Sequence, residues 1–212
     1  MTNLKSPDKL LLLGGSSCVL FFTFLQVPFL FLRLYVVFIF LIILFSIKFK
    51  DRDTTFIAII AAIPVCLEMV IFNTGLVSLE STEEERLFQN TIIFGIQFLA
   101  NLAALIPMVL RVEFQSKIWP FYEPKLTIAD SVFPYTLLTS SVVIFCSLIE
   151  NYLRNGLGYD IRFFYSIYDI VGYFVLCISA TVLTYMTWNS YVDNKFRQLP
   201  SLKKSKKRNK EA

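Results

Sequence analysis

Long apolar runs separated by short polar segments make up most of the chain. The first run covers residues 10–47, with Arg33 as its only charge and Pro28 as its only proline. One straight helix of this length would reach roughly 57 Å at 1.5 Å per residue, whereas the hydrocarbon core of a bilayer is about 30 Å thick. The run is therefore expected to form two helices, 10–26 and 28–47, that fold back on each other as a tight hairpin.

Four further apolar runs are long enough to cross a membrane. They predict helices at 54–79, 87–110, 126–153 and 161–191. The expected fold is all-α: a polytopic integral membrane protein with six transmembrane helices and short loops, among them a polar, aromatic loop at 111–125. Residues 1–191 form the membrane domain, and residues 192–212 form a basic tail. One alternative stays open, in which the hairpin of 10–47 enters and leaves on one side as a wedge in a single leaflet.

The distribution of charge predicts the orientation of these helices. Cytoplasmic loops of membrane proteins carry an excess of Lys and Arg. With a cytoplasmic N-terminus, six crossings place the acidic cluster at 80–85 outside. The inner side then receives most of the basic residues, namely Lys5, Lys9, Lys48, Lys50, Arg52, Arg111, Lys117, Lys125 and the tail. Both termini are therefore expected in the cytoplasm.

Composition leaves no room for a large soluble domain beside the membrane helices. The chain is 56% hydrophobic and only 17% charged, whereas soluble domains have about 25% charged residues. The net charge of +4 comes from the tail, because residues 195–210 carry eight basic and no acidic residues. All four cysteines lie inside apolar runs and are interpreted as small buried hydrophobic residues.

Candidate enzyme chemistry is sparse. The chain has no histidine, which removes the commonest general base and the commonest metal ligand. The sequence also lacks a nucleophile elbow, a P-loop and a paired-aspartate metal motif. We therefore expect no cofactor, no metal and no enzyme activity.

Polar residues within the apolar runs are the main candidates for function. Glu68 is expected near the middle of its helix, where a charge costs about 2.5–3.5 kcal/mol on insertion scales, and no basic residue is expected at the same depth. Glu68 is interpreted either as a hydrogen-bond anchor between helices or as a proton or cation site. Asn90, Gln97 and Asn101 fall on one face of the next helix. Gln97 and Asn101 lie at a depth that could meet Glu68.

Other polar residues lie nearer the ends of the predicted helices. Asp169 is expected about two turns below the outer surface, among tyrosines whose hydroxyls it could bond. Asp130 and the Glu150-Asn151 pair are expected at the inner and outer ends of one helix. These residues are therefore placed near the membrane–water interfaces.

The tail carries a dense basic cluster. Its members are Lys203, Lys204, Lys206, Lys207, Arg208 and Lys210. Each basic residue near an anionic leaflet contributes about 1 kcal/mol, so the cluster is expected to bind anionic lipid headgroups. The end of the tail also resembles the dilysine retrieval signals of endoplasmic-reticulum membrane proteins, with Arg208 where a lysine would stand. We expect an endoplasmic-reticulum or related endomembrane location, with a bacterial inner membrane as the alternative.

Together these features predict a non-catalytic, multi-pass endomembrane protein that acts in assembling, chaperoning or shaping membrane components. Its expected partners are the lipid bilayer and other membrane proteins, and not nucleic acid. The first alternative is a small transporter or substrate-binding membrane subunit that uses a polar site of Glu68, Gln97 and Asn101. The second alternative is a membrane enzyme that depends on an intramembrane carboxylate.

Overall fold

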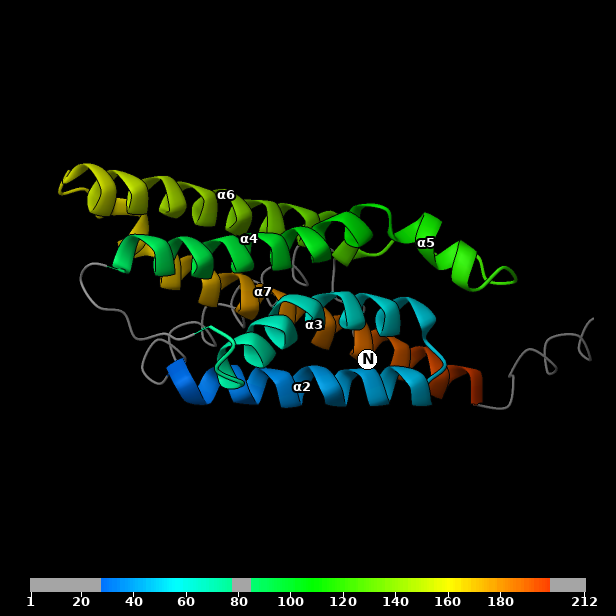
Figure 1. Ribbon diagram of the computed structural model, residues 1–212. Helices are drawn as coiled ribbons and strands as arrows, with labels where there is room; N and C mark the ends of the chain where they lie inside the picture. Colours follow the sequence, from blue (N-terminus) through cyan, green and yellow to red (C-terminus); the bar gives the residue numbers. More distant parts are fainter. Residues whose placement is uncertain (1–27, 78–84, 199–212) are drawn as a thin grey trace, which may run out of the picture.

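The computed structural model describes residues 28–77 and 85–198, and this part of the chain consists of helices without strands (Figure 1). The helices are α2 (Pro28–Lys48), α3 (Arg52–Asn73), α4 (Arg86–Val109), α5 (Arg111–Ile118), α6 (Ile128–Leu157) and α7 (Phe163–Gln198). The predicted helix at 10–26, the acidic cluster at 80–85 except for Glu85, and the basic cluster of the tail lie outside the described residues.

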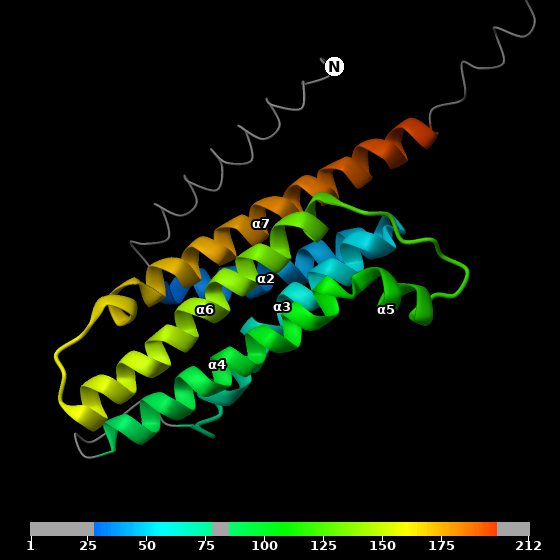
Figure 2. The same ribbon diagram turned by 90° about the horizontal axis from the view of Figure 1, so that it is seen from above.

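The five long helices form one elongated bundle. α3 packs between α2 and α4, α4 packs on α6, α6 packs on α7, and α7 returns to α2 (Figures 1 and 2). At one end of the bundle α2 and α4 finish, α3 and α6 begin, and α5 projects away from the other helices. We call this the α5 end. The opposite end contains the turn from α6 to α7.

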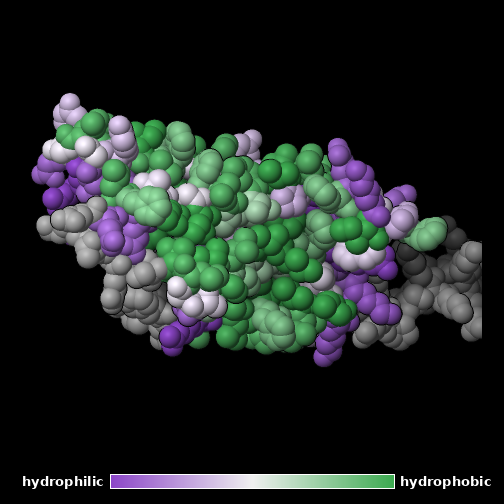
Figure 3. All heavy atoms as spheres, in the orientation of Figure 1, coloured by the Kyte–Doolittle hydropathy of each residue, from purple (hydrophilic) through white to green (hydrophobic). Residues whose placement is uncertain are grey.

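The surface of the bundle fits a membrane. The helices α3, α4, α6 and α7 are each long and apolar enough to cross a bilayer. In the view of Figure 3, hydrophobic side chains cover the middle of the bundle, and hydrophilic ones gather at its two ends. An apolar belt between polar ends is the arrangement that a bilayer requires. The chain is therefore an integral, multi-pass membrane protein.

Small side chains bring α4 and α6 close together. Ala100 and Ala104 of α4 are buried, as are Ser140 and Ser147 of α6. In lipid, helix association depends on close packing and interhelical hydrogen bonds, and small residues permit both. These two helices therefore pack closely enough to position the polar side chains between them.

Several helix boundaries differ from the sequence predictions. The helix predicted at 54–79 ends at Asn73, because Thr74 caps it through bonds to the carbonyl of Val70, and Gly75 has a left-handed φ of 72°. The helix predicted to end at 153 continues to Leu157, where Gly158 in the left-handed region stops it. The predicted helix at 161–191 begins later and runs on to Gln198.

The segment predicted as a loop at 111–125 contains the helix α5. Arg111 and Gln115 of α5 face the bundle and are buried, whereas Val112, Phe114 and Ile118 are exposed. Apolar residues therefore point outward and polar residues inward. This inverted pattern explains why the hydrophobic period of the sequence gave no sign of a helix here.

Candidate functional site

A buried arginine network closes the α5 end of the bundle. Arg111 follows α4 directly and is only 1% exposed. Its Nη1 donates to Asp53 of α3 at 2.8 Å and to Gln115 of α5 at 2.6 Å. Its Nη2 donates to Asp130 of α6 at 2.8 Å and to the carbonyl of Lys125 at 2.5 Å, and its Nε also contacts Asp130. One guanidinium therefore joins three helices and the loop before α6.

The electrostatics of this network favour the charged arginine. Burial alone would lower the pKa of Arg111, but the hydrogen bonds and charges of Asp130 and Asp53 outweigh burial and raise it. Bidentate contact between a guanidinium and a carboxylate is among the strongest polar contacts in proteins. The sequence predicted a loop at Arg111, whereas the structure places this residue at the start of α5 and buries it. Its pairing with Asp130 was not predicted.

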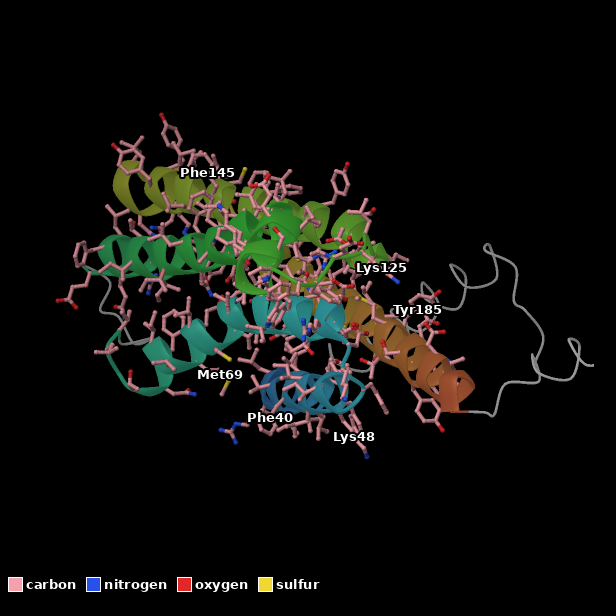
Figure 4. All side chains as sticks on the ribbon, turned by 90° about the vertical axis from the view of Figure 1, so that its right-hand side faces the viewer. Phe40, Lys48, Met69, Lys125, Phe145 and Tyr185 are labelled. Carbon is pink, nitrogen blue, oxygen red and sulfur yellow. The ribbon has the colours of Figure 1, made fainter. Side chains whose placement is uncertain are left out.

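Further contacts tie the loop after α5 to α3. The hydroxyl of Tyr122 donates to Asp53 at 2.8 Å. Burial and this bond to a carboxylate raise the pKa of Tyr122. The guanidinium of Arg52 lies over the rings of Trp119 and Tyr122, at 5.6 and 5.3 Å from their centroids. Figure 4 faces this end and labels Lys48 and Lys125, which stand at its surface.

Asp51 holds α3 and α7 together at the same end. Its side chain caps α3 by accepting from the backbone N–H of Thr54 at 3.1 Å. It also accepts from the hydroxyl of Ser190, near the end of α7. The Asp51–Asp53 segment, which looks like a polar loop in the sequence, therefore connects the start of α3 to α7, to α5 and to the loop after α5.

Asparagines join α4 to α6 near the opposite end. Asn90 donates to Asn151 of α6 at 3.2 Å, and Asn151 donates to the carbonyl of Leu87 and to the hydroxyl of Thr91, both at 3.1 Å. Asn151 is 2% exposed. Asn151 therefore packs between two helices near the end of α6, and its place near the outer membrane interface stays a prediction.

Glu150 caps the start of α7. Its Oε2 accepts from the backbone N–H groups of Phe164 at 2.6 Å and Tyr165 at 3.4 Å. A carboxylate at a helix N-terminus satisfies backbone donors and complements the helix dipole. Glu150 is 3% exposed, and its Oε1 has no partner among the described residues. Its predicted position near the outer membrane interface stays a prediction.

The polar residues predicted on one face of α4 have partners on different helices. Asn101 donates to Ser140 of α6 at 3.1 Å, in a fully buried contact. Gln97 instead faces α3 and α7, where its amide interacts with the carboxyl of Glu68 and the hydroxyl of Tyr168. Gln97 therefore meets Glu68 as the depth argument allowed, whereas Asn101 bonds to a different helix.

The depth predicted for Glu68 needs correction. α3 ends at Asn73, so Glu68 lies only about 8 Å of helix from that end and not in the middle of the helix. Arg33 of α2 and Glu68 both lie roughly 23 Å from the turn between α2 and α3, so a basic residue does stand at a similar depth. Arg33 is exposed, and within the described residues no ion pair joins it to Glu68.

Asp169 lies on an exposed face of α7. Its charge acts on the hydroxyls of Tyr168 and Tyr173. Throughout the segments that the structure covers, no group of three or more potential metal ligands comes together.

Sequence reasoning missed two features of these sites. The tyrosines near Asp169 were considered only as its partners, so the contact of Tyr168 with Gln97 was not predicted, and neither were the ionic contacts of Arg111. The sequence did contain a sign of the Arg111 contacts, because Asp53, Arg111 and Asp130 are all predicted at the cytoplasmic side of the membrane. Opposite charges at one face are candidates for pairing.

Comparison with known proteins gives no relative. No protein-family model, no curated protein and no solved structure matches the chain. The class of protein is therefore defined by the fold alone, as a helical, multi-pass integral membrane protein.

Proposed function

We propose that the protein is a non-catalytic, multi-pass endomembrane protein that assembles with, chaperones or shapes other membrane components. In this proposal six helices cross the membrane, with 10–26 and α2 forming the hairpin, and both termini lie in the cytoplasm. The favoured location is the endoplasmic reticulum or a related endomembrane.

One observation carries the proposal: the polar side chains between the helices are used to fasten the bundle. Asn101 bonds to Ser140, Asn90 to Asn151, and Arg111 to two aspartates. Within the described helices, these polar groups therefore bind one another. A rigid bundle with an apolar lateral surface is suited to contacts with lipid and with the helices of other membrane proteins.

The charge of the two ends supports the proposed orientation. The exposed basic residues at the α5 end are Lys48, Lys50, Arg52, Lys117 and Lys125. Several acidic residues of this end are turned inward onto Arg111 or serve as helix caps. A surplus of exposed basic charge is typical of a cytoplasmic face.

The tail supports the proposed location and a lipid contact. Its cluster of basic residues at 203–210 would add electrostatic attraction to an anionic leaflet. Deleting residues 203–212 should move a fluorescently tagged protein out of the endoplasmic reticulum. A truncated protein that keeps its location would contradict the retrieval role.

Crosslinking within the membrane tests the assembly role. Phe40 of α2 and Phe145 of α6 are 59% and 49% exposed on the lateral surface of the bundle, and both are labelled in Figure 4. A photoreactive amino acid at each position, activated in native membranes, should give a discrete protein adduct from at least one of them. Adducts with lipid alone at both positions, and no membrane protein copurifying in mild detergent, would contradict the proposal.

The transporter alternative has one specific observation in its favour. Glu68 and Gln97 form a polar site inside the bundle, and Oε1 of Gln97 has no partner in the described structure. Glu68→Gln keeps the hydrogen-bonding shape and removes ionisation. A proton-coupled uptake activity that this variant abolishes would favour a transporter over an assembly protein.

A further inference from the structure

An exposed apolar stripe runs along α5. Its members are Leu110, which directly precedes the helix, Phe114 and Ile118, and all three side chains are exposed. Their spacing of four residues keeps them within about 80° of one another around a helix. We call these three residues the α5 stripe. The buried residues Arg111 and Gln115 occupy a different face of the same helix.

The α5 stripe continues the outer surface of α4. Leu99, Ile106 and Leu110 are spaced by seven and four residues, which places them on one face of α4, and all three are exposed. α4 is long and apolar enough to cross a bilayer, so this exposed face contacts lipid. Leu110 belongs to both stripes and therefore joins the lipid-facing surface of α4 to α5.

Both ends of α5 are held at the depth where other membrane helices begin. Arg111 bonds to Asp53 and Asp130, which lie in the first turns of α3 and α6. Just after α5, the ring of Trp119 packs edge-on against Phe56 of α3, with centroids 6.0 Å apart. Figure 2 shows α5 turning away from the line of α4 and leading outward. The helix therefore lies near a membrane–water interface, where indole rings are enriched.

Exposed basic residues outnumber exposed acidic ones around α5. Lys117 lies directly beside the α5 stripe, one residue before Ile118. The exposed basic residues of this end are Lys48, Lys50, Arg52, Lys117 and Lys125. Among side chains that the structure describes, the exposed acidic residues of this end are Glu113, Glu123 and Asp193. Basic charge beside an apolar stripe is typical of helices that lie on an anionic leaflet.

We infer that α5 is an interfacial membrane anchor, whose apolar stripe enters the leaflet at the α5 end and whose basic neighbours bind anionic lipid headgroups. The occupant of this surface is the lipid of the membrane that the bundle crosses. The inference goes beyond the proposed assembly role and does not depend on it, because lipid contact can be measured in vesicles without any partner protein.

Spin labels on the two faces of α5 test the anchor. The full-length chain, with its four natural cysteines replaced, carries a nitroxide at Ile118→Cys in the stripe or at Ser116→Cys on the exposed polar face. In vesicles of phosphatidylcholine and phosphatidylglycerol, the label at residue 118 should be reached by oxygen more than by a water-soluble nickel chelate. The label at residue 116 should show the opposite order. Phe114→Cys provides a second stripe position and should behave like Ile118→Cys.

Two results would overturn the anchor. Equal access of the nickel chelate to the labels at residues 116 and 118 would show that the stripe faces water. Shielding of the labels at residues 114 and 118 from both reagents would show that protein, and not lipid, covers the stripe.

Spin-labelled lipids test the headgroup contact. The wild type should prefer spin-labelled phosphatidylglycerol to phosphatidylcholine at its boundary. Replacing Lys117 and Lys125 together by Gln should lower this preference by about twofold or more, because each basic residue near the leaflet adds attraction. Replacing both by Arg is the matched control, which keeps the charge and should keep the preference. Equal preferences in the wild type and the double Gln variant would overturn the headgroup contact.

Discussion

At the scale of single residues, the side chain of Arg111 is the main polar connection between the helices at the α5 end. It is buried and bonds to Asp53, Asp130, Gln115 and the carbonyl of Lys125. The first two partners lie 58 and 19 positions away in sequence. Pairs this distant depend on how the helices pack, which no local pattern encodes. The charges were therefore visible in the sequence, but their pairing was not.

Replacing Arg111 should destabilise the protein strongly. Arg111→Met keeps much of the length of the side chain but leaves the buried Asp53 and the partly buried Asp130 without their counter-charge. Breaking a buried ion pair by removing one partner costs about 3–5 kcal/mol. Chemical unfolding in detergent should show a loss of this order. Arg162→Ala is the control, because the Arg162–Asp160 pair is exposed, and such pairs contribute about 0–1 kcal/mol. Equal, small losses for both variants would contradict the role given to Arg111.

The hydroxyl of Tyr122 should make stability depend on alkaline pH. Burial and the bond to Asp53 raise its pKa in the folded protein above the ordinary value of about 10. Above about pH 10 the unfolded chain loses this proton first, so the stabilisation present at lower pH is lost as pH rises. The melting temperature of the wild type should therefore fall more steeply in this range than that of Tyr122→Phe. Parallel curves would contradict this account.

At the scale of single helices, the sequence predicted the existence of the long helices well and their ends less well. Length and apolar composition are local properties, and they located α2, α3, α4, α6 and α7. Helix ends depend on caps and backbone conformation, such as Gly75 after α3 and Gly158 after α6. α5 was missed because its buried face is polar.

The start of α7 should depend on Glu150. Glu150→Ala removes the acceptor for the N–H groups of Phe164 and Tyr165, and loss of a helix cap typically costs about 1 kcal/mol. Hydrogen–deuterium exchange should therefore speed up in the first turn of α7, while α6 stays protected. Glu150→Gln keeps an oxygen acceptor and should show a smaller increase. Unchanged exchange in Glu150→Ala would show that α7 starts without this cap.

At the scale of the whole molecule, hydrophobicity and charge predicted a membrane bundle but not its arrangement. Apolar length alone indicated the membrane class, and four described helices meet that criterion. The order in which α2, α3, α4, α6 and α7 surround one another follows from side-chain fit between helices. Depth along the helices was enough to place Gln97 near Glu68 from the sequence. The bond of Asn101 to Ser140 depends on which helix Asn101 faces, and the sequence does not show this.

The central proposal is that α3, α4, α6 and α7 cross the membrane with the α5 end in the cytoplasm. Labelling of single cysteines tests it most directly, in a chain whose four natural cysteines are replaced. In sealed vesicles with the cytoplasmic face outward, an impermeant maleimide should label Lys48→Cys, Glu123→Cys and Ser201→Cys. Asp160→Cys should react only after the vesicles are permeabilised. Labelling of Asp160→Cys in sealed vesicles, or protection of Lys48→Cys or Glu123→Cys, would contradict this topology.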